Sequence, residues 1–87
     1  MILRIFCIRD RAADAFGQPM FFQSRGGAIR SFSDEVNNQK RDSSQISLHP
    51  EDFELFEIGS WNDQDCTFDL SPRPVQCAVG KDLLVKQ

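Results

Sequence analysis

Residue types that commonly do chemistry are few in this chain, and none stands in a recognisable catalytic arrangement. His49 is the only histidine, and it precedes Pro50 at what resembles the start of a helical turn. A histidine at such a place is typically a cap or a surface residue. No serine or cysteine has an obvious base beside it in the sequence, and pairing with His49 in space is the alternative left open. We therefore predict no catalytic residues and no enzymatic activity.

Possible metal ligands are more numerous but poorly spaced for a metal site. The acidic residues after His49 are Glu51, Asp52, Glu54 and Glu57. They lack the loop spacing of a calcium site, so a solvated acidic face is the favoured interpretation. The cysteines are Cys7, Cys66 and Cys77, and no two have the short spacing of a zinc or redox motif. We expect no metal and no cofactor, and we interpret Cys7 and Cys66 as small hydrophobic residues of a core in a reducing compartment.

Arginines and aromatic rings are interleaved in the N-terminal half, a pattern that nucleic-acid binding would use. The candidate contacts are Arg9, Arg11, Arg25 and Arg30, with Phe21 and Phe22 as stacking rings. Single-stranded DNA requires cations for its backbone and rings for its bases. The competing interpretation is that most of these rings are needed in the core. Residues 25–27 (Arg-Gly-Gly) could hold a phosphate before a helix, but no Gly-Lys-Ser/Thr follows, so a plain helix start is favoured.

The charge is unevenly distributed along the chain. The net charge is −3, with seven Lys and Arg against four acids in residues 1–41 and three against nine in residues 42–87. A protein that coats duplex DNA would normally be basic overall, so strong non-specific duplex binding is not expected. A basic face that engages nucleic acid, or complementary pairing between copies of the chain, fits the asymmetry better.

The elements that must position these residues form one domain over residues 1–87. Residues 2–8 are apolar on both alternating faces, as in a central strand. Ser24 is suited to cap a helix that ends near residues 37–38 and buries the face formed by Ile29, Phe32 and Val36. Because adjacent residues of an extended segment point in opposite directions, one of Phe21 and Phe22 should enter the core and the other should lie on the opposite side.

The C-terminal half predicts a hairpin. Two strand-like segments flank a turn rich in Asn and Asp, namely residues 55–59 and 66–70 around residues 62–65. The alternating apolar residues of the second strand, which should form its buried side, are Cys66, Phe68 and Leu70. Pro72 and Pro74 should end that strand. The fold class is therefore α+β, with one main helix packed on a small, mostly antiparallel sheet of three to four strands.

Three further expectations concern the surface. Residues 38–47 should form an exposed loop, and residues 75–87 a tail or short helix. The apolar run at residues 1–8 is too short for a membrane span of about 20 residues, and it lacks a signal cleavage site, so no membrane association is expected. One helix cannot cover both apolar faces of the sheet, so we predict a homodimer; the alternative is a tail that folds back and leaves a monomer.

The order of several segments is informative beyond their composition. These segments are Ile8-Arg9-Asp10, Pro19-Met20-Phe21-Phe22, the helix from Gly27 to Asn37, and the stretch from His49 to Phe56 with Gly59. In this order they resemble the small nonstructural protein of gokushoviruses, which are tailless single-stranded DNA phages of the microvirus family. The resemblance covers about residues 1–70, and residues 49–59 are its most specific part.

The resemblance implies a role in viral genome replication or packaging, in the host cytoplasm, by binding and without a catalytic motif. The binding implied is to single-stranded DNA or to a viral or host replication protein, and it includes assistance with the switch to single-stranded DNA synthesis. The alternative hypothesis is a protein-interaction module that binds a viral or host protein through an apolar and acidic surface. The two differ in their dependence on salt, which is steep for phosphate contacts.

Overall fold

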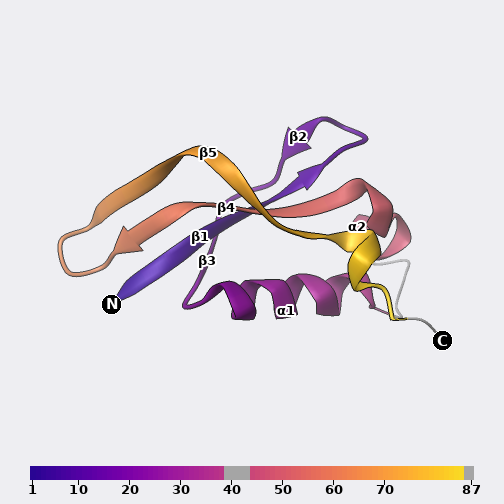
Figure 1. Cartoon of the computed structure of the whole chain (residues 1–87), viewed down its shortest axis with the longest axis horizontal. Helices are drawn as coiled ribbons and strands as arrows, with labels where there is room; N and C mark the ends of the chain where they lie inside the picture. The colour runs from indigo at the N-terminus through magenta and orange to yellow at the C-terminus, as the bar shows by residue number, and fades with distance from the viewer. Residues whose placement is uncertain (39–43, 86–87) are drawn as a thin grey trace.

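The computed structural model describes residues 1–38 and 44–85. Its strands form one antiparallel sheet in the order β2-β1-β4-β5, and β3 also pairs with β1. The strands are β1 (Ile2–Asp10), β2 (Ala15–Phe16), β3 (Met20–Phe22), β4 (Phe53–Asn62) and β5 (Thr67–Val79). Helix α1 (Arg25–Val36) lies along one face of the sheet, and no helix of the described ranges lies over the other face (Figure 1). The predicted α+β class is confirmed, with the two-residue strand β2 bringing the sheet to five strands.

Strand β1 is central, and this explains its apolar residues on both faces. It pairs with β4 along its length, while β2 and β3 pair with its other edge. Neighbouring side chains of a strand point to opposite faces, so Phe6 enters the core beneath α1 and Ile5 points away from the helix. Both side chains are buried, at 0% and 2% exposure.

Helix α1 forms where the sequence predicted it. The Ser24 hydroxyl accepts a hydrogen bond from the Gly27 N–H at 3.0 Å, and the helix ends at its C-cap Asn37. The helix buries Phe32 and Val36 as expected, whereas Ile29 is only partly buried at the rim of the core. The core cluster consists of Phe6, Ala28, Phe32, Val36, Phe53 and Leu55.

The hairpin is longer than the sequence indicated. Strand β5 continues to Val79, so the prediction that Pro72 and Pro74 end it is wrong. β5 is an edge strand, and both prolines lie between Leu70 and Val75, where its register with β4 is interrupted, so neither removes a ladder hydrogen bond. Residues 75–79 therefore belong to the sheet. Of the expected C-terminal tail or short helix, the described part that remains outside the sheet is the 3-10 helix η3 (Gly80–Leu83) and residues 84–85.

Two short helical segments connect α1 to β4. They are α2 (Gln45–Leu48) and the 3-10 helix η2 (Pro50–Asp52), with Pro50 in the first position as expected. Of the loop expected at residues 38–47, residues 39–43 lie outside the described part of the chain. Residues 45–48 are helical, and this corrects the prediction for that portion.

Candidate functional site

The face of the sheet that points away from α1 carries a continuous group of apolar side chains. Register places Trp61 opposite Leu3, Phe21 opposite Ile5, and Phe68 opposite Trp61. Paired residues of antiparallel strands share a face, so all of them lie on the side away from the helix. We call this surface the open face, and it consists of Leu3, Ile5, Phe21, Ile58, Trp61, Phe68 and Leu70.

The open face is hollowed into two shallow depressions of about 720 and 530 Å³, both of which include Phe21 and Phe68. The Phe21 and Trp61 rings meet edge to face, with centroids 6.0 Å apart. Phe68 is 58% exposed and Leu70 is 61% exposed. No residue that lines either depression carries a charged side chain. The surface therefore offers apolar and aromatic contact and almost no Coulomb attraction.

These exposures correct one prediction. Phe68 and Leu70 share a face as expected, but that face is uncovered rather than buried. Cys66 is not a core residue, because it lies in the turn before β5 with a φ of 57° and is exposed. Cys7 is buried as predicted, and burial raises the pKa of its thiol.

Gly59 of β4 determines how closely β5 approaches at the open face. β4 has a register irregularity between Glu57 and Gly59 as it pairs with β5. Gly59 has a φ of 156°, and a Cβ there would meet the Asp69 carbonyl oxygen and come within 2.9 Å of the Leu70 Cα. A residue without a side chain thus lets β5 approach closely and sets Leu70 beside Ile58.

Two of the predicted DNA contacts stand at one end of the open face, and both lie near carboxylates. The Arg9 guanidinium lies 2.5 Å from Asp14 Oδ1 and 3.6 Å from Glu54 Oε1, and Arg11 Nε lies 3.7 Å from that same Glu54 oxygen. The Glu54 carboxylate also accepts a hydrogen bond from the Gln76 amide. These arginines are therefore largely compensated where they lie.

The other two predicted contacts belong to the opposite side of the molecule. Arg25 donates to Glu57 Oε1 at 2.9 Å, and Arg4 donates to both oxygens of the same carboxylate at 2.6 and 2.8 Å. Arg30 is exposed on α1 and has no ion pair with any residue in the described ranges. The four arginines therefore do not form one surface, and the structure brings together only Arg9 and Arg11.

The sequence assigned Glu57 to a solvated acidic face, and the structure corrects this, because Glu57 and Glu54 are both largely buried. The Glu57 side chain is only 12% exposed. Burial raises the pKa of Glu57, but hydrogen bonds and charge from Arg4 and Arg25 outweigh burial and hold that pKa below its usual value. The same hydrogen bond raises the pKa of Arg4. The cluster is a local structural clamp between β1, β4 and the first turn of α1.

The two predicted stacking rings separate as expected. Phe22 packs edge to face against Phe6, with centroids 5.8 Å apart, and so belongs to the core side. Phe21 lies on the open face and is 45% exposed. The rings that share the open face with Phe21 are Trp61 and Phe68, and neither was singled out from the sequence. The signal for Phe68 was its alternation with polar neighbours, which marks a face without showing whether anything covers it.

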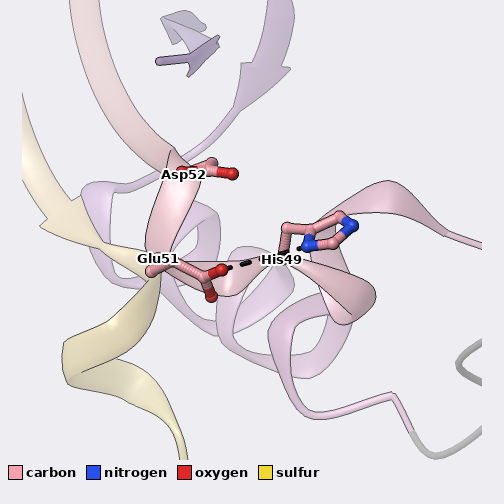
Figure 2. Close-up of side chains that lie close together, drawn as sticks. All are labelled: His49, Glu51 and Asp52. Atoms are coloured by element: carbon pink, nitrogen blue, oxygen red, sulfur yellow. Dashed lines mark ion pairs between the residues drawn. The ribbon is translucent and has the colours of Figure 1, made fainter. Parts of the chain in front are cut away.

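His49, Glu51 and Asp52 are the one group in the described ranges whose side-chain ligand atoms could surround a metal ion. Figure 2 shows His49 just before the 3-10 helix η2 and Glu51 and Asp52 within it, with His49 Nδ1 3.9 Å from Glu51 Oε1. His49 and Glu51 are more than half exposed, so water can solvate both groups. This arrangement is what an exposed acidic turn produces on its own, and it does not by itself make a metal site.

Comparison with known proteins gives one result. A family model described as phage ORF5 protein matches residues 3–83, from β1 through η3. No curated protein and no solved structure matches the chain. Within the described ranges, none of the helices combines the length and the apolar character needed to cross a bilayer.

Proposed function

Because the chain belongs to the phage ORF5 protein family, we propose that it is a nonstructural phage protein that assists genome replication or packaging in the host cytoplasm. It acts by binding and not by catalysis, and the surface that binds is the open face. The partner of that face is a protein. The resemblance of residues 1–70 to the gokushovirus nonstructural protein supports the replication role.

One observation carries the choice of surface, which is the gathering of exposed apolar side chains on a single face. Phe21, Phe68 and Leu70 each expose close to half of their surface or more. Contiguous exposed apolar patches are uncommon on monomeric proteins and mark sites of protein contact. Aromatic residues in a shallow depression are also the usual centre of a protein interface.

Electrostatics favours a protein over single-stranded DNA as the partner. The charges near the open face include Arg9 and Arg11, but Glu54 and Asp14 compensate them. At the other end the hairpin turn adds the carboxylate of Asp65, and that of Asp63, which is paired with the Met1 ammonium at 2.7 Å. A phosphate backbone that crosses this face would meet no net positive charge, so the electrostatic part of its affinity would be absent.

Single-stranded DNA is the second candidate, and the exposed rings favour it. Phe21, Trp61 and Phe68 stand on adjacent strands of one sheet face, as stacking platforms for unpaired bases do. Arg9 lies on this same face and could exchange its carboxylate partners for phosphates.

A capture experiment from infected cells tests the proposal. The tagged chain is compared with Leu70→Ser in the open face and with Leu48→Ser as a matched control, since Leu48 is 44% exposed on α2. We expect phage or host replication proteins to copurify with the native chain and with Leu48→Ser, and to be lost with Leu70→Ser. Equal recovery with all three chains would exclude the open face as the binding surface.

Salt dependence separates the two candidates. Binding of labelled oligodeoxythymidylate is measured by fluorescence anisotropy from low to high salt. A DNA-binding chain shows a log–log slope of about −0.7 for each phosphate contact. We expect no measurable affinity at physiological salt, and a slope of several units together with tight binding would favour the DNA candidate instead.

A further inference from the structure

We propose that the protein on the open face is a second copy of this chain, packed face to face across a two-fold axis with the strands of the two sheets antiparallel. The inference rests on the proposed function, because it names the protein that covers the open face. Phage or host proteins are then captured by the dimer, and Leu70→Ser loses them because it separates the two copies. It also fixes the orientation of the pair. The argument uses the area of the molecule, the chemistry of the open face and the charges at its two ends.

The accessible surface area of the molecule is larger than that expected for a folded monomer of its mass. Its accessible surface is 6032 Å², and a folded chain of 9.9 kDa is expected to expose about 5,200 Å². The excess of about 800 Å² equals the area that each partner contributes to a standard protein interface. The molecule is elongated, at 44 × 24 × 20 Å, and an elongated shape exposes more surface than a compact one of the same mass.

The chemistry of the open face is self-complementary. A two-fold interface brings the same patch of both subunits together. The residues near the axis therefore contact the same residues of the other copy and must not repel them. The centre of the open face is Ile5, surrounded by Phe21, Ile58 and Leu70 without a charged side chain among them. Two such centres can meet with no charge repulsion, as the inner faces of a sheet sandwich do at a spacing of about 10 Å.

The charges at the two ends of the open face decide the orientation. At the hairpin end, Asp63 is already paired with the Met1 ammonium at 2.7 Å, so Asp65 is the carboxylate that remains. At the other end, Arg9 is paired with Asp14, so Arg11, which is 55% exposed and 3.7 Å from Glu54, is the cation most open to a new partner. Strands that run parallel in the two copies would place acidic turn against acidic turn. Antiparallel strands, with the axis near Ile5, place each hairpin turn over the arginine end of the other copy. Complementary ends of this kind orient association more than they strengthen it.

Sedimentation of the purified full chain tests the association. At tens of micromolar we expect a species of twice 9.9 kDa that dissociates on dilution. Leu70→Asp should be monomeric at the same concentration, while Leu48→Asp stays dimeric. Both residues are exposed, and circular dichroism of each variant checks that it retains its fold. A native chain that sediments as a monomer throughout would overturn the inference, as would a folded Leu70→Asp that still dimerises.

A charge exchange tests the orientation. Asp65→Lys and Arg11→Glu should each raise the dissociation constant by about threefold at low salt, as expected for an exposed charge pair. The double variant should recover native affinity, because the exchanged charges meet across the interface. A double variant weaker than either single variant would overturn the antiparallel arrangement.

Failure of this inference and failure of the proposed function give different results. A monomeric native chain that still loses its phage or host proteins on Leu70→Ser would refute the dimer and leave the open face as a protein-binding surface. Addition of oligodeoxythymidylate to the native dimer should leave its sedimentation unchanged. Dissociation of the dimer into DNA-bound monomers would show that nucleic acid occupies the open face, and would overturn both proposals.

Discussion

At the scale of single residues, the Glu57 carboxylate of β4 links its own strand to β1 and α1 on the helix side of the sheet. It accepts hydrogen bonds from Arg4 of β1 and from Arg25 in the first turn of α1. Glu57 is 12% exposed, whereas its partners Arg4 and Arg25 are 38% and 48% exposed. Loss of the carboxylate therefore leaves two cations without compensation. The clamp therefore uses two of the chain's arginines for stability.

Glu57→Gln should lower the free energy of unfolding at neutral pH by about 1–2 kcal/mol, because it removes charge-assisted hydrogen bonds while solvent screens part of the loss. The pKa of Glu57 is lowered in the folded chain, so its stabilisation is present above the unfolded pKa of about 4.3 and is lost as pH falls through the folded value. Urea melts at several pH values should show the two chains converging below about pH 4. Glu51→Gln, at a carboxylate that is more than half exposed, is the control, and an equal loss there would contradict the clamp.

Two glycines of the chain should respond to alanine in opposite directions. Gly59→Ala should cost about 1–3 kcal/mol, because the new methyl group meets the Asp69 carbonyl and the φ of 156° is unfavourable for alanine. Gly26→Ala should stabilise by up to about 1 kcal/mol, since it lies in α1 with nothing within 4 Å of the new atom. Chemical denaturation of both variants checks the pair. Tolerance of alanine at position 59 would show that β4 and β5 can separate there at little cost.

At the scale of elements, α1 supplies most of the cover for the core. Phe32 is 2% exposed at the centre of the helix face and belongs to the core cluster with Phe6 and Leu55. Phe32→Ala should lower the free energy of unfolding by roughly 3–5 kcal/mol through the cavity that it opens. For a domain of this size that is much of the total stability. A chemical melt that shows a loss below about 1 kcal/mol would contradict the central place of Phe32.

The sequence predicted correctly those features that depend on neighbouring residues in the chain, such as the helix cap and the alternation of side chains along a strand. Ser24 caps α1 because its side chain can satisfy an N–H that the first turn leaves free, and Phe21 and Phe22 diverge because a strand alternates. The end of β5 depended on its neighbours instead. Pro72 stops a strand only where its N–H would be needed, and the sequence does not show that β5 lies at the edge of the sheet.

The candidate surface was predictable only in part for a related reason. Alternation marked Phe68 and Leu70 as one face, but whether a second layer covers a face depends on the number of helices and where they pack. The arginines divide between the two sides because Arg9 follows the odd positions of β1, while Arg25 begins the helix on the opposite side. The charge pattern along the chain therefore predicted one basic face, whereas the fold places these arginines on two different sides of the sheet.

At the scale of the whole molecule, no helix of the described ranges covers the side of the sheet that faces away from α1 (Figure 1). Ile5 is buried on the open side only by shallow cover from its neighbours. A second copy would deepen that cover. Association and folding would then be coupled, since each copy completes the other's second apolar layer.

Coupled association makes the melting temperature of the native chain depend on its concentration. If the dimer unfolds directly to separate chains, a hundredfold increase in concentration adds about 2.7 kcal/mol per dimer. With the usual entropy of unfolding per residue, this raises the midpoint by about 7 °C. Calorimetry of the native chain and of Leu48→Asp should show this rise, whereas Leu70→Asp should melt at one temperature throughout. A native melting temperature that does not change with concentration would mean that the chain folds as a monomer. The partner of the open face would then be a protein other than a second copy of this chain.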